Sequence, residues 1–205
     1  VLERVKAQGG KLVFFSSDYV FDGKNGPYSE EDEARPLCVY GRHKLEAEQM
    51  IIAAGIDCLI VRTTWVYGPE KRGKNFVLSL RRRLGQGELV KVPRDQIGSP
   101  TYSINLAEVL EHLVRQKKTG LYNIVGPALL DRFSFAQEIC RAFGLPLENL
   151  CPVTTGELGQ KAMRPLKAGL KTGKVCRDVP VALEDYRTGL ARLKQATALL
   201  TGETP

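Results

Sequence analysis

Residues 11–23, KLVFFSSDYVFDG, carry the pattern that decides the fold of this chain. The run Lys11–Ser17 is almost continuously apolar and ends in two hydroxyl side chains, which is typical of a strand buried on both faces of a parallel sheet. Turn-forming residues follow at 22–26, so the chain is expected to leave the strand in a loop. The stretch therefore predicts an α/β protein with polar side chains at the carboxyl end of a buried strand.

A helix and a second strand follow within sixty residues of the first. The acidic stretch Glu30–Glu33 is interpreted as a solvated loop, and it leads into a helix expected over Tyr40–Gly55. A second buried strand, DCLIVRTTWVY, is expected over Asp57–Tyr67. Strand, helix and strand in this order predict a parallel crossover. Ligands collect outside the carboxyl ends of such strands, so Ser16–Tyr19 and Thr63–Tyr67 are expected to line one cleft.

The rest of the chain alternates between helical and strand-like patterns without an internal repeat. Residues 1–10 look like the tail of a helix closed by glycines, and Ser134 and Gln137 have the spacing of a capping box that would begin another helix. The segment Pro146–Pro180 is expected to be irregular. The remaining expected elements are helices over 75–84, 104–115, 134–144 and 183–200, and strands over 89–92 and 121–125.

Composition narrows the class of protein. A chain of 205 residues with 43% hydrophobic and 26% charged content fits one globular domain. We expect a soluble cytoplasmic protein, because neither a membrane span nor a signal pattern is evident. The net charge of +7 suits an anionic cofactor, and nucleic acid is not expected because no aromatic residues alternate with the basic clusters. Five scattered cysteines and two histidines indicate neither a disulfide framework nor a metal site.

Tyr40 and Lys44 stand four residues apart in YGRHK, which places both side chains on one face of a helix. This spacing is common by chance, but here the helix lies between two strands that end in Ser17 and in Thr63. Carbonyl reduction needs a proton donor, and a phenol with a pKa of about 10 donates well only when its anion is stabilised by nearby positive charge. A hydroxyl such as Ser17 can hydrogen-bond the same substrate oxygen.

These residues lie in short blocks that together resemble the extended short-chain dehydrogenase/reductases and, within them, the dTDP-4-dehydrorhamnose reductase family. The blocks occur in the order and spacing of that family and cover roughly residues 10–193. They are SSDYVFDG (Ser16–Gly23), PY (Pro27, Tyr28), YGRHKLEAE (Tyr40–Glu48), VRTTWVYG (Val61–Gly68), NF (Asn75, Phe76), DQIGSPT (Asp95–Thr101) and RP (Arg164, Pro165).

The resemblance implies a Rossmann-type parallel sheet with a small C-terminal lobe, and an NADPH- or NADH-dependent reduction of the 4-keto group of a nucleotide-sugar. It assigns proton donation to Tyr40, the nicotinamide ribose and the tuning of Tyr40 to Lys44, and the positioning of the carbonyl to Ser17. Thr63 is implied as a further cofactor contact. The implied substrate-binding residues are Asp18, Tyr19, Trp65, Asn75 and Arg164, and no metal is implied.

Simpler interpretations remain open at three of these positions. Trp65 could be a core residue, Arg164 a surface charge, and Asn75 the N-cap of its helix. We interpret residues 1–205 as one partial NAD(P)-binding domain, in which 1–68 contain the core strands and the catalytic helix. Residues 69–205 then contain further core and the substrate-binding lobe.

The glycine-rich turn that binds the cofactor pyrophosphate in this family is not found in residues 1–205. Relative to the family we expect the chain to lack three to four βα units, on the order of 90 residues. The strand Lys11–Ser17 would then have an unpaired edge, which predicts a fragment, a product of a truncated reading frame or half of a split protein. The expected partner is a second copy in a homodimer or a complementing N-terminal half. Ala168 and Lys171 stand where the family usually has a hydroxyl and an acidic residue, so the bound sugar nucleotide stays open.

Two other functions also stay open. The regulatory subunit of methionine adenosyltransferase resembles the same family and shares the SSDYVFDG-type block, so a non-catalytic binding subunit is one alternative. An inactive fragment is the other. Enzymatic activity is expected of the complete protein rather than of the isolated 205-residue chain.

Overall fold

Strand β1 (Leu12–Ser17) forms where the apolar run predicts it. A computed structural model describes the backbone of residues 1–201 and the side chains of residues 1–198. In it β1 pairs in parallel with β2 (Cys58–Thr63), which pairs in parallel with β7 (Gly120–Asn123). The register sets Ser17 opposite Thr63. The predicted parallel pair is confirmed, and its two polar strand ends lie side by side.

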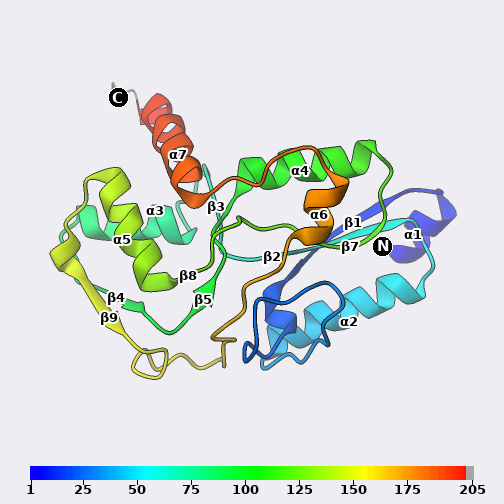
Figure 1. Ribbon diagram of the computed structural model, residues 1–205, viewed down its shortest axis with the longest axis horizontal. Coiled ribbons are helices and arrows are strands. Elements are labelled where there is room, and N and C mark those ends of the chain that lie inside the picture. Colours follow the sequence, from blue (N-terminus) through cyan, green and yellow to red (C-terminus); the bar gives the residue numbers. More distant parts are fainter. Residues whose placement is uncertain (202–205) are drawn as a thin grey trace.

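The sheet is covered on both faces, which is why β2 is buried along its whole length. Helix α2 (Val39–Ala53) packs on one face, where Ile51 meets Ile60. Helices α4 (Ser103–Arg115) and α6 (Gly173–Asp178) cover the other face, which includes Leu59 and Val61. Figure 1 shows the strands running between α4 and α2. Alternate residues of one short strand thus enter two different cores, and this produces the unbroken apolar run.

Strand β1 lies at the edge of this sheet, because β2 is its only strand partner among the described residues. Phe15 is 44% exposed there. The short helix α1 (Leu2–Ala7) precedes β1 and has no buried residue. The expected open edge is therefore present in the structure.

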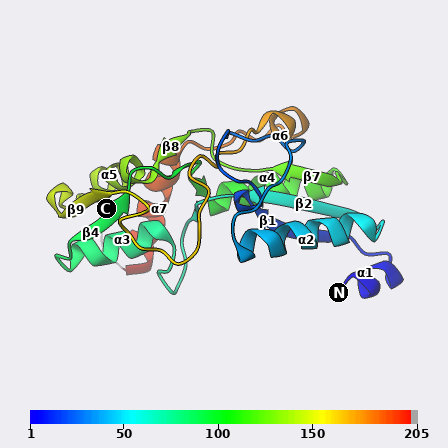
Figure 2. The same cartoon turned by 90° about the horizontal axis from the view of Figure 1, so that it is seen from below.

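A second half of the molecule, the far lobe, extends from the carboxyl ends of these strands (Figures 1 and 2). It is built around a core that includes Tyr67, Tyr102 and Phe135. Three helices surround this core, and the strands beside them form two-stranded sheets. The helices are α3 (Phe76–Gly85), α5 (Arg132–Phe143) and α7 (Tyr186–Thr201); the strand pairs are β3 (Val66–Tyr67) with β6 (Thr101–Tyr102), β4 (Val90–Pro93) with β9 (Leu150–Val153), and β5 (Ile97–Gly98) with β8 (Leu130–Asp131).

The prediction of one continuous strand over Asp57–Tyr67 is wrong. Strand β2 ends at Thr63 and a separate strand begins at Val66. Trp65, at the break between them, takes a φ of 44°, a conformation that bulky residues rarely adopt. Residues after the break join β6 instead of β7, in a different sheet. Bulky apolar residues occur on both sides of the break, because Trp65 and Tyr67 pack into a second core, so hydrophobicity alone could not locate it.

Two further expectations need correction. Helix α5 begins at Arg132 with Asp131 as its N-cap, since the Asp131 carboxylate accepts from the backbone N–H of Ser134 at 2.8 Å. The Ser134 and Gln137 capping box is therefore wrong. The segment Pro146–Pro180 is not wholly irregular, because it contains a 3₁₀ turn (Leu147–Asn149), β9 and α6.

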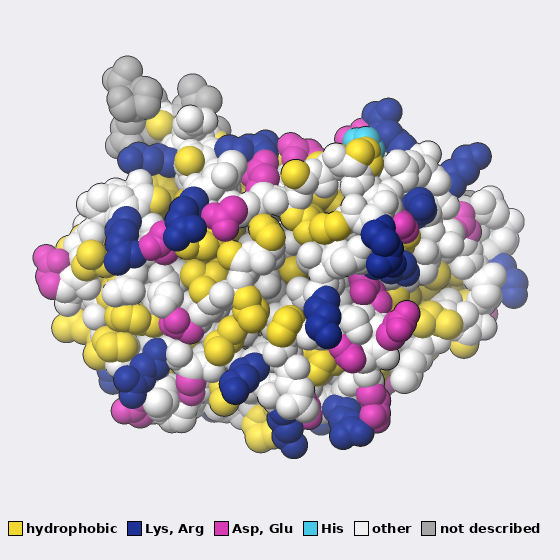
Figure 3. Space-filling view, viewed as in Figure 1, with side chains coloured by type: hydrophobic (Ala, Val, Ile, Leu, Met, Phe, Trp, Pro, Cys, Tyr) yellow, Lys and Arg dark blue, Asp and Glu magenta, His cyan; other side chains and the backbone are white. Residues whose placement is uncertain are grey.

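The surface carries charges of both signs. In the view of Figure 3, basic and acidic side chains are interspersed over this face rather than gathered into one field. Residues 1–201 include no helix that is long and apolar enough to cross a membrane.

Candidate functional site

The carboxyl ends of β1 and β2 are joined by a buried hydroxyl and carboxylate cluster. Ser17 donates to one oxygen of Asp18 at 2.9 Å, and Thr64 donates to the other at 2.8 Å. Ser17 also caps the 3₁₀ turn Asp18–Val20 by accepting from the backbone N–H of Tyr19 at 3.3 Å. The structure therefore brings Ser17, Asp18 and Thr64 together at the strand ends, whereas Val66 and Tyr67 of the same predicted cleft line a different pocket.

Asp18 is 2% exposed, and this burial raises the pKa of its carboxyl to about 6. The hydrogen bonds from Thr64 and Ser17 and the positive charge of Arg132 oppose that rise. A carboxyl with such a pKa changes protonation state close to neutral pH. When Asp18 is protonated it can donate to Ser17, and the Ser17 proton then becomes available to a ligand.

Tyr40 and Lys44 lie on one face of α2, as their spacing predicted. The Nζ atom of Lys44 lies 5.8 Å from the centre of the Tyr40 ring and 4.8 Å from that of Phe14. The same ammonium donates to the carbonyl oxygen of Phe15 at 2.7 Å, which ties α2 to β1. Tyr40 is 52% exposed, and no partner of its hydroxyl is found among the described side chains. The phenol is therefore free to meet a ligand.

Tyr19 connects Tyr40 to the far lobe. The rings of Tyr19 and Tyr40 meet edge to face at 5.5 Å, and the Tyr19 hydroxyl accepts from Arg164. This approach requires Gly41, because a Cβ atom there would lie 2.1 Å from the Tyr19 carbonyl oxygen. Arg164 is thus partly buried and held against Tyr19, and a substrate contact from it remains a prediction.

A pocket of about 380 Å³ opens beside Tyr40. It separates the start of α2 from residues 161–163 of the far lobe, directly before Arg164. A ligand in this pocket would meet both halves of the molecule. Its lining residues are Leu37, Cys38, Val39, Tyr40, Arg42, Lys161, Ala162 and Met163.

Trp65 packs partly into the core of the far lobe, with its ring 6.3 Å from that of Phe135. Gly98 gives it room, because a Cβ atom at that position would lie 2.8 Å from Cε2 of the indole. The positive φ of Trp65 is a strained conformation of the kind that tends to persist at functional sites. The core-packing interpretation and a ligand-facing role therefore both remain compatible with its position.

Arg132 is a residue of this site that the sequence analysis missed. Its guanidinium carbon lies 4.2 Å from the Trp65 ring centre and 4.7 Å from that of Phe76. Burial lowers its pKa to about 10, and the charges of Tyr19, Arg164 and Asp18 also act on it. No motif marks this arginine, and only its approach to Trp65 across 67 residues of sequence reveals it.

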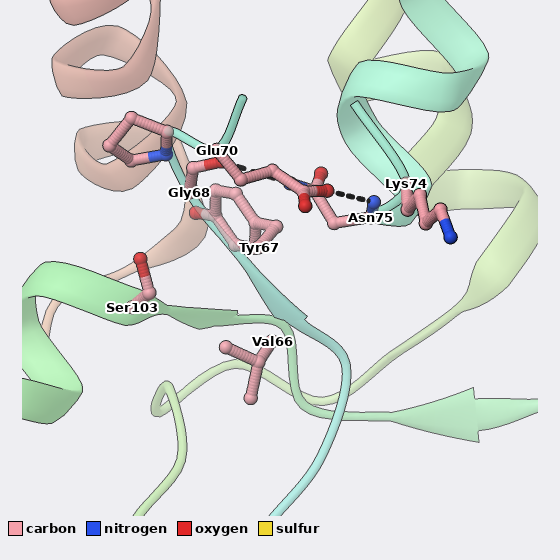
Figure 4. A pocket seen from close by; sticks show the side chains of 8 residues that line it. Val66, Tyr67, Gly68, Glu70, Lys74, Asn75 and Ser103 are labelled. Carbon is pink, nitrogen blue, oxygen red and sulfur yellow. Dashed lines mark hydrogen bonds between the residues drawn. The ribbon is translucent and has the colours of Figure 1, made fainter. Parts of the chain in front are cut away.

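Asn75 is the N-cap of α3, as its simpler interpretation predicted. Its Oδ1 accepts from the backbone N–H of Leu78 at 3.1 Å, and its Nδ2 donates to the Gly68 carbonyl at 2.9 Å. Asn75 lines a pocket of about 390 Å³ together with Lys74 and Ser103 (Figure 4). Its side chain is directed to backbone groups, and a substrate contact from it remains a prediction.

Two hydroxyls at the strand ends lack partners. Ser16 Oγ and Thr63 Oγ1 are buried, and neither has a hydrogen-bond partner. Buried polar groups normally have partners, so these hydroxyls are suited to a polar ligand at this edge. The predicted contact of Thr63 with the cofactor stays a prediction.

A buried ion pair joins β2 to α2 next to the strand ends. Arg62 on β2 binds both carboxylate oxygens of Glu48 on α2, at 3.0 and 2.6 Å. The two side chains are 5% and 2% exposed. This pair fixes α2 against the strand that continues into Thr63 and Thr64.

Comparison with known proteins agrees with this geometry. Residues 1–198 match the family model described as the RmlD substrate binding domain. A dTDP-4-dehydrorhamnose reductase of Aggregatibacter actinomycetemcomitans is 31% identical over 199 residues, which are 89% of this chain and 66% of that protein. Methionine adenosyltransferase 2 subunit beta of Danio rerio is also 31% identical, over 83% of this chain and 55% of that protein.

Solved structures show the same likeness. The crystal structure of dTDP-4-dehydrorhamnose reductase from Bacillus anthracis in complex with NADP superposes with a TM-score of 0.90 at 30% identity, covering 96% of this chain and 69% of that chain. The predicted Rossmann-type α/β fold is thereby confirmed. The chain spans 66% and 55% of the lengths of the two curated relatives, so it corresponds to part of each of them.

Proposed function

From the premise that this chain belongs to the RmlD substrate binding domain family of dTDP-4-dehydrorhamnose reductases, we propose that the protein reduces the 4-keto group of a nucleotide-sugar. NADPH or NADH would supply the hydride. The observation that supports the proposal is that α2 lies against the end of β1 on both sides of Ser17: Lys44 bonds the carbonyl of Phe15, and the half-exposed Tyr40 packs against Tyr19.

The three side chains have distinct roles in this reaction. Tyr40 donates a proton to the carbonyl oxygen as negative charge develops on it. Lys44 places an ammonium 5.8 Å from the Tyr40 ring, where it stabilises the negative charge left on the phenol oxygen. Ser17 holds the substrate oxygen by a hydrogen bond. Ser17 donates its hydroxyl proton to Asp18 in the structure, so it must give up this hydrogen bond to donate to the substrate. Protonation of Asp18 favours that exchange.

The remaining predicted contacts fall on two sides of the reacting group. On the cofactor side, Tyr40, Lys44 and Thr63 would hold the nicotinamide ribose, and the unpartnered Thr63 hydroxyl suits that role. On the substrate side, the sugar would lie toward the far lobe, against Asp18, Tyr19, Trp65, Asn75 and Arg164. The proposed reductase would be cytoplasmic. Its partner would be a second copy of the protein or a complementing N-terminal half.

The test is a turnover assay with a complete cofactor site. The full-length protein that carries this chain is given NADPH or NADH and a dTDP-4-keto-6-deoxysugar, and oxidation of the cofactor is followed by its absorbance. Tyr40→Phe should lower kcat at least about a hundredfold with little change in cofactor affinity, because only the proton donor is removed. Tyr102→Phe, at a buried tyrosine outside the site, is the control. No turnover by the unaltered protein would refute the proposal.

A non-catalytic regulatory subunit is the second candidate, favoured by the match to methionine adenosyltransferase 2 subunit beta. Such a protein would bind a partner enzyme and stimulate it regardless of the phenol. Co-purification with that enzyme and equal stimulation by Tyr40→Phe would favour this alternative over reduction.

A further inference from the structure

Two clusters of basic residues have no part in the proposed reduction. They are Lys71, Arg72 and Lys74 in the loop before α3, and Arg81–Arg83 within that helix. Residues of both clusters meet at a pocket of about 800 Å³. The fold thus brings together charges that a loop and a helix carry separately in the sequence. The residues that line this pocket are Glu70, Lys71, Arg72, Gly73, Leu78, Arg81, Arg82, Gly85, Gln86 and Thr197.

The wall that α3 contributes is a single stripe of its surface. Its members recur three or four residues apart, at Leu78, Arg81, Arg82 and Gly85. The residues that α3 buries in the core of the far lobe lie outside this stripe. A Cβ atom at Gly85 would meet no neighbouring atom within 4 Å. The stripe therefore presents two guanidinium groups beside open space.

The cations of this pocket lack carboxylate partners. Within residues 1–198, none of its two lysine and arginine pairs forms an ion pair. The next residue of α3, Arg83, lies outside the pocket lining and is paired with Glu88 at 2.7 Å. Among the described residues, the one carboxylate in the lining is that of Glu70, which accepts a hydrogen bond from the backbone N–H of Asn75. The pocket is therefore net positive and attracts anions.

The side chain of Arg81 is held on its own side of the pocket. Its Nη1 donates to the Thr197 hydroxyl at 3.1 Å, and its guanidinium carbon lies 5.2 Å from the centre of the Phe143 ring. A guanidinium has five N–H donors, so most of them are left for a ligand. An anion bound here would meet a charge that is already oriented, which reduces the entropy lost on binding.

We propose that this pocket binds a small molecule that carries several phosphate groups, such as a nucleoside polyphosphate. The cations lie on both walls, so the ligand must present several anionic groups to meet them together. Guanidinium forks match phosphate oxygens, and a chain of phosphates concentrates its charge within one pocket. A volume of about 800 Å³ suits a whole organic ligand rather than a bare ion, and Leu78 adds apolar surface for its organic part.

Other polyanions fit this pocket less well. Single-stranded nucleic acid binds to aromatic rings that stack on its bases, and no aromatic residue of the described chain lines the pocket. An extended acidic peptide spreads its charges over about 3.3 Å per residue, so few of them can lie in one pocket. The inference goes beyond the proposed reduction and does not depend on it, because the lining contains none of the predicted catalytic, cofactor-binding or substrate-binding residues.

The test measures binding at this pocket. The full-length protein that carries this chain is saturated with NADPH, which occupies the cofactor site, and is then titrated calorimetrically with ATP, with inorganic tripolyphosphate and with a hexaglutamate peptide. The unaltered protein should bind ATP and tripolyphosphate more tightly than the peptide. Arg72→Gln and Arg82→Gln, one on each wall, should each weaken ATP and tripolyphosphate by about tenfold to a hundredfold, since a bond to a charged group is lost.

Arg83→Gln is the matched control, because it removes the same charge from the same helix outside the pocket. It should leave both affinities unchanged, and none of the three variants should alter cofactor oxidation. Arg82 stands in the last turn of α3, where a cation also stabilises the helix end. If that is its whole role, Arg82→Gln lowers the melting temperature and leaves the affinities unchanged.

That result would overturn the inference. So would a failure of the unaltered protein to bind either phosphate compound in the millimolar range, or an equal loss in Arg83→Gln. Tighter binding of hexaglutamate would assign the pocket to an acidic protein segment instead. Binding that depends on Arg72 and Arg82 in a protein that does not oxidise the cofactor would uphold the inference while refuting the proposed reductase activity.

Discussion

Tyr40 and Arg132 belong to the same candidate site, but their surroundings differ in almost every respect. Tyr40 is 52% exposed on α2, and its hydroxyl is free. Arg132 is stacked against two aromatic rings, and burial lowers its pKa to about 10. The position of Tyr40 follows from helix geometry, whereas that of Arg132 follows from long-range packing. Changes on the exposed α2 side should therefore affect activity alone, and changes among the buried groups should affect stability as well.

The largest effect is expected at the buried Arg62–Glu48 ion pair, which holds α2 and its exposed Tyr40 against β2. Arg62→Met should lower the free energy of unfolding by about 3–5 kcal/mol, because it leaves the Glu48 carboxylate buried and unpaired. Chemical denaturation measures this change. Arg115→Met removes an exposed ion pair with Glu111 and should cost less than about 1 kcal/mol. Equal losses in the two variants would contradict the importance of burial.

The exposed side is tested by Lys44. Lys44→Met should reduce kcat about a hundredfold, equivalent to about 2.7 kcal/mol on the barrier, with a much smaller effect on stability. Steady-state kinetics and thermal unfolding together check this. Lys174→Met is a close control, since Lys174 also donates to a backbone carbonyl at 2.7 Å and lies over a tyrosine ring, but outside the site. A loss of activity in both variants would assign the effect to strand anchoring.

Asp18 should impose a pH dependence on stability. Burial raises its pKa from 3.8 to about 6, so the folded protein holds this proton more tightly than the unfolded chain. Below about pH 3.8 the protonated Asp18 contributes its full stabilisation. As the pH rises through about 6 this contribution is lost, which lowers the free energy of unfolding by roughly 2–3 kcal/mol. Asp18→Asn should therefore gain stability relative to the unaltered protein over this window. Parallel unfolding free energies of the two proteins between pH 4 and 7 would contradict this.

The smallest effect is expected at Asn75. Asn75→Ala should destabilise the protein by about 1 kcal/mol, because the cap of α3 and the bond to Gly68 are both lost. Asn75→Ser keeps a capping oxygen and should recover part of that loss. A change of substrate KM in Asn75→Ser without a change in melting temperature would instead reveal the predicted substrate contact.

The exposed side of the site was largely predictable from the sequence. The apolar runs predicted β1 and β2, and the positions of Ser17, Tyr40 and Lys44 followed from the strand end and the helical period. These signals are local, because strand and helix geometry repeat every few residues. The start of α5 was misplaced, because Asp131 competed with Ser134 as a cap and only the fold decides between them.

The buried side could not have been predicted in this way. Arg132 reaches Trp65 only because the chain turns after Thr63, and Gly98 leaves the space that the indole fills. The pairing of Glu48 with Arg62 could not be predicted from the sequence either, because no local pattern distinguishes these two residues from other charged residues.

The sequence by itself determined the parallel α/β core, the polar strand ends and the Tyr40 and Lys44 pair, because each depends on the spacing of near neighbours. The tertiary structure alone decided that Asp18 is buried and hydrogen-bonded twice, and that Arg132 and Arg164 lie near Tyr19 without an ion pair in the described part of the chain. Burial and electrostatic environment arise from contacts between distant segments. They set the protonation and ligand preference of a site of which the sequence had shown only the residues near the strand ends and on α2.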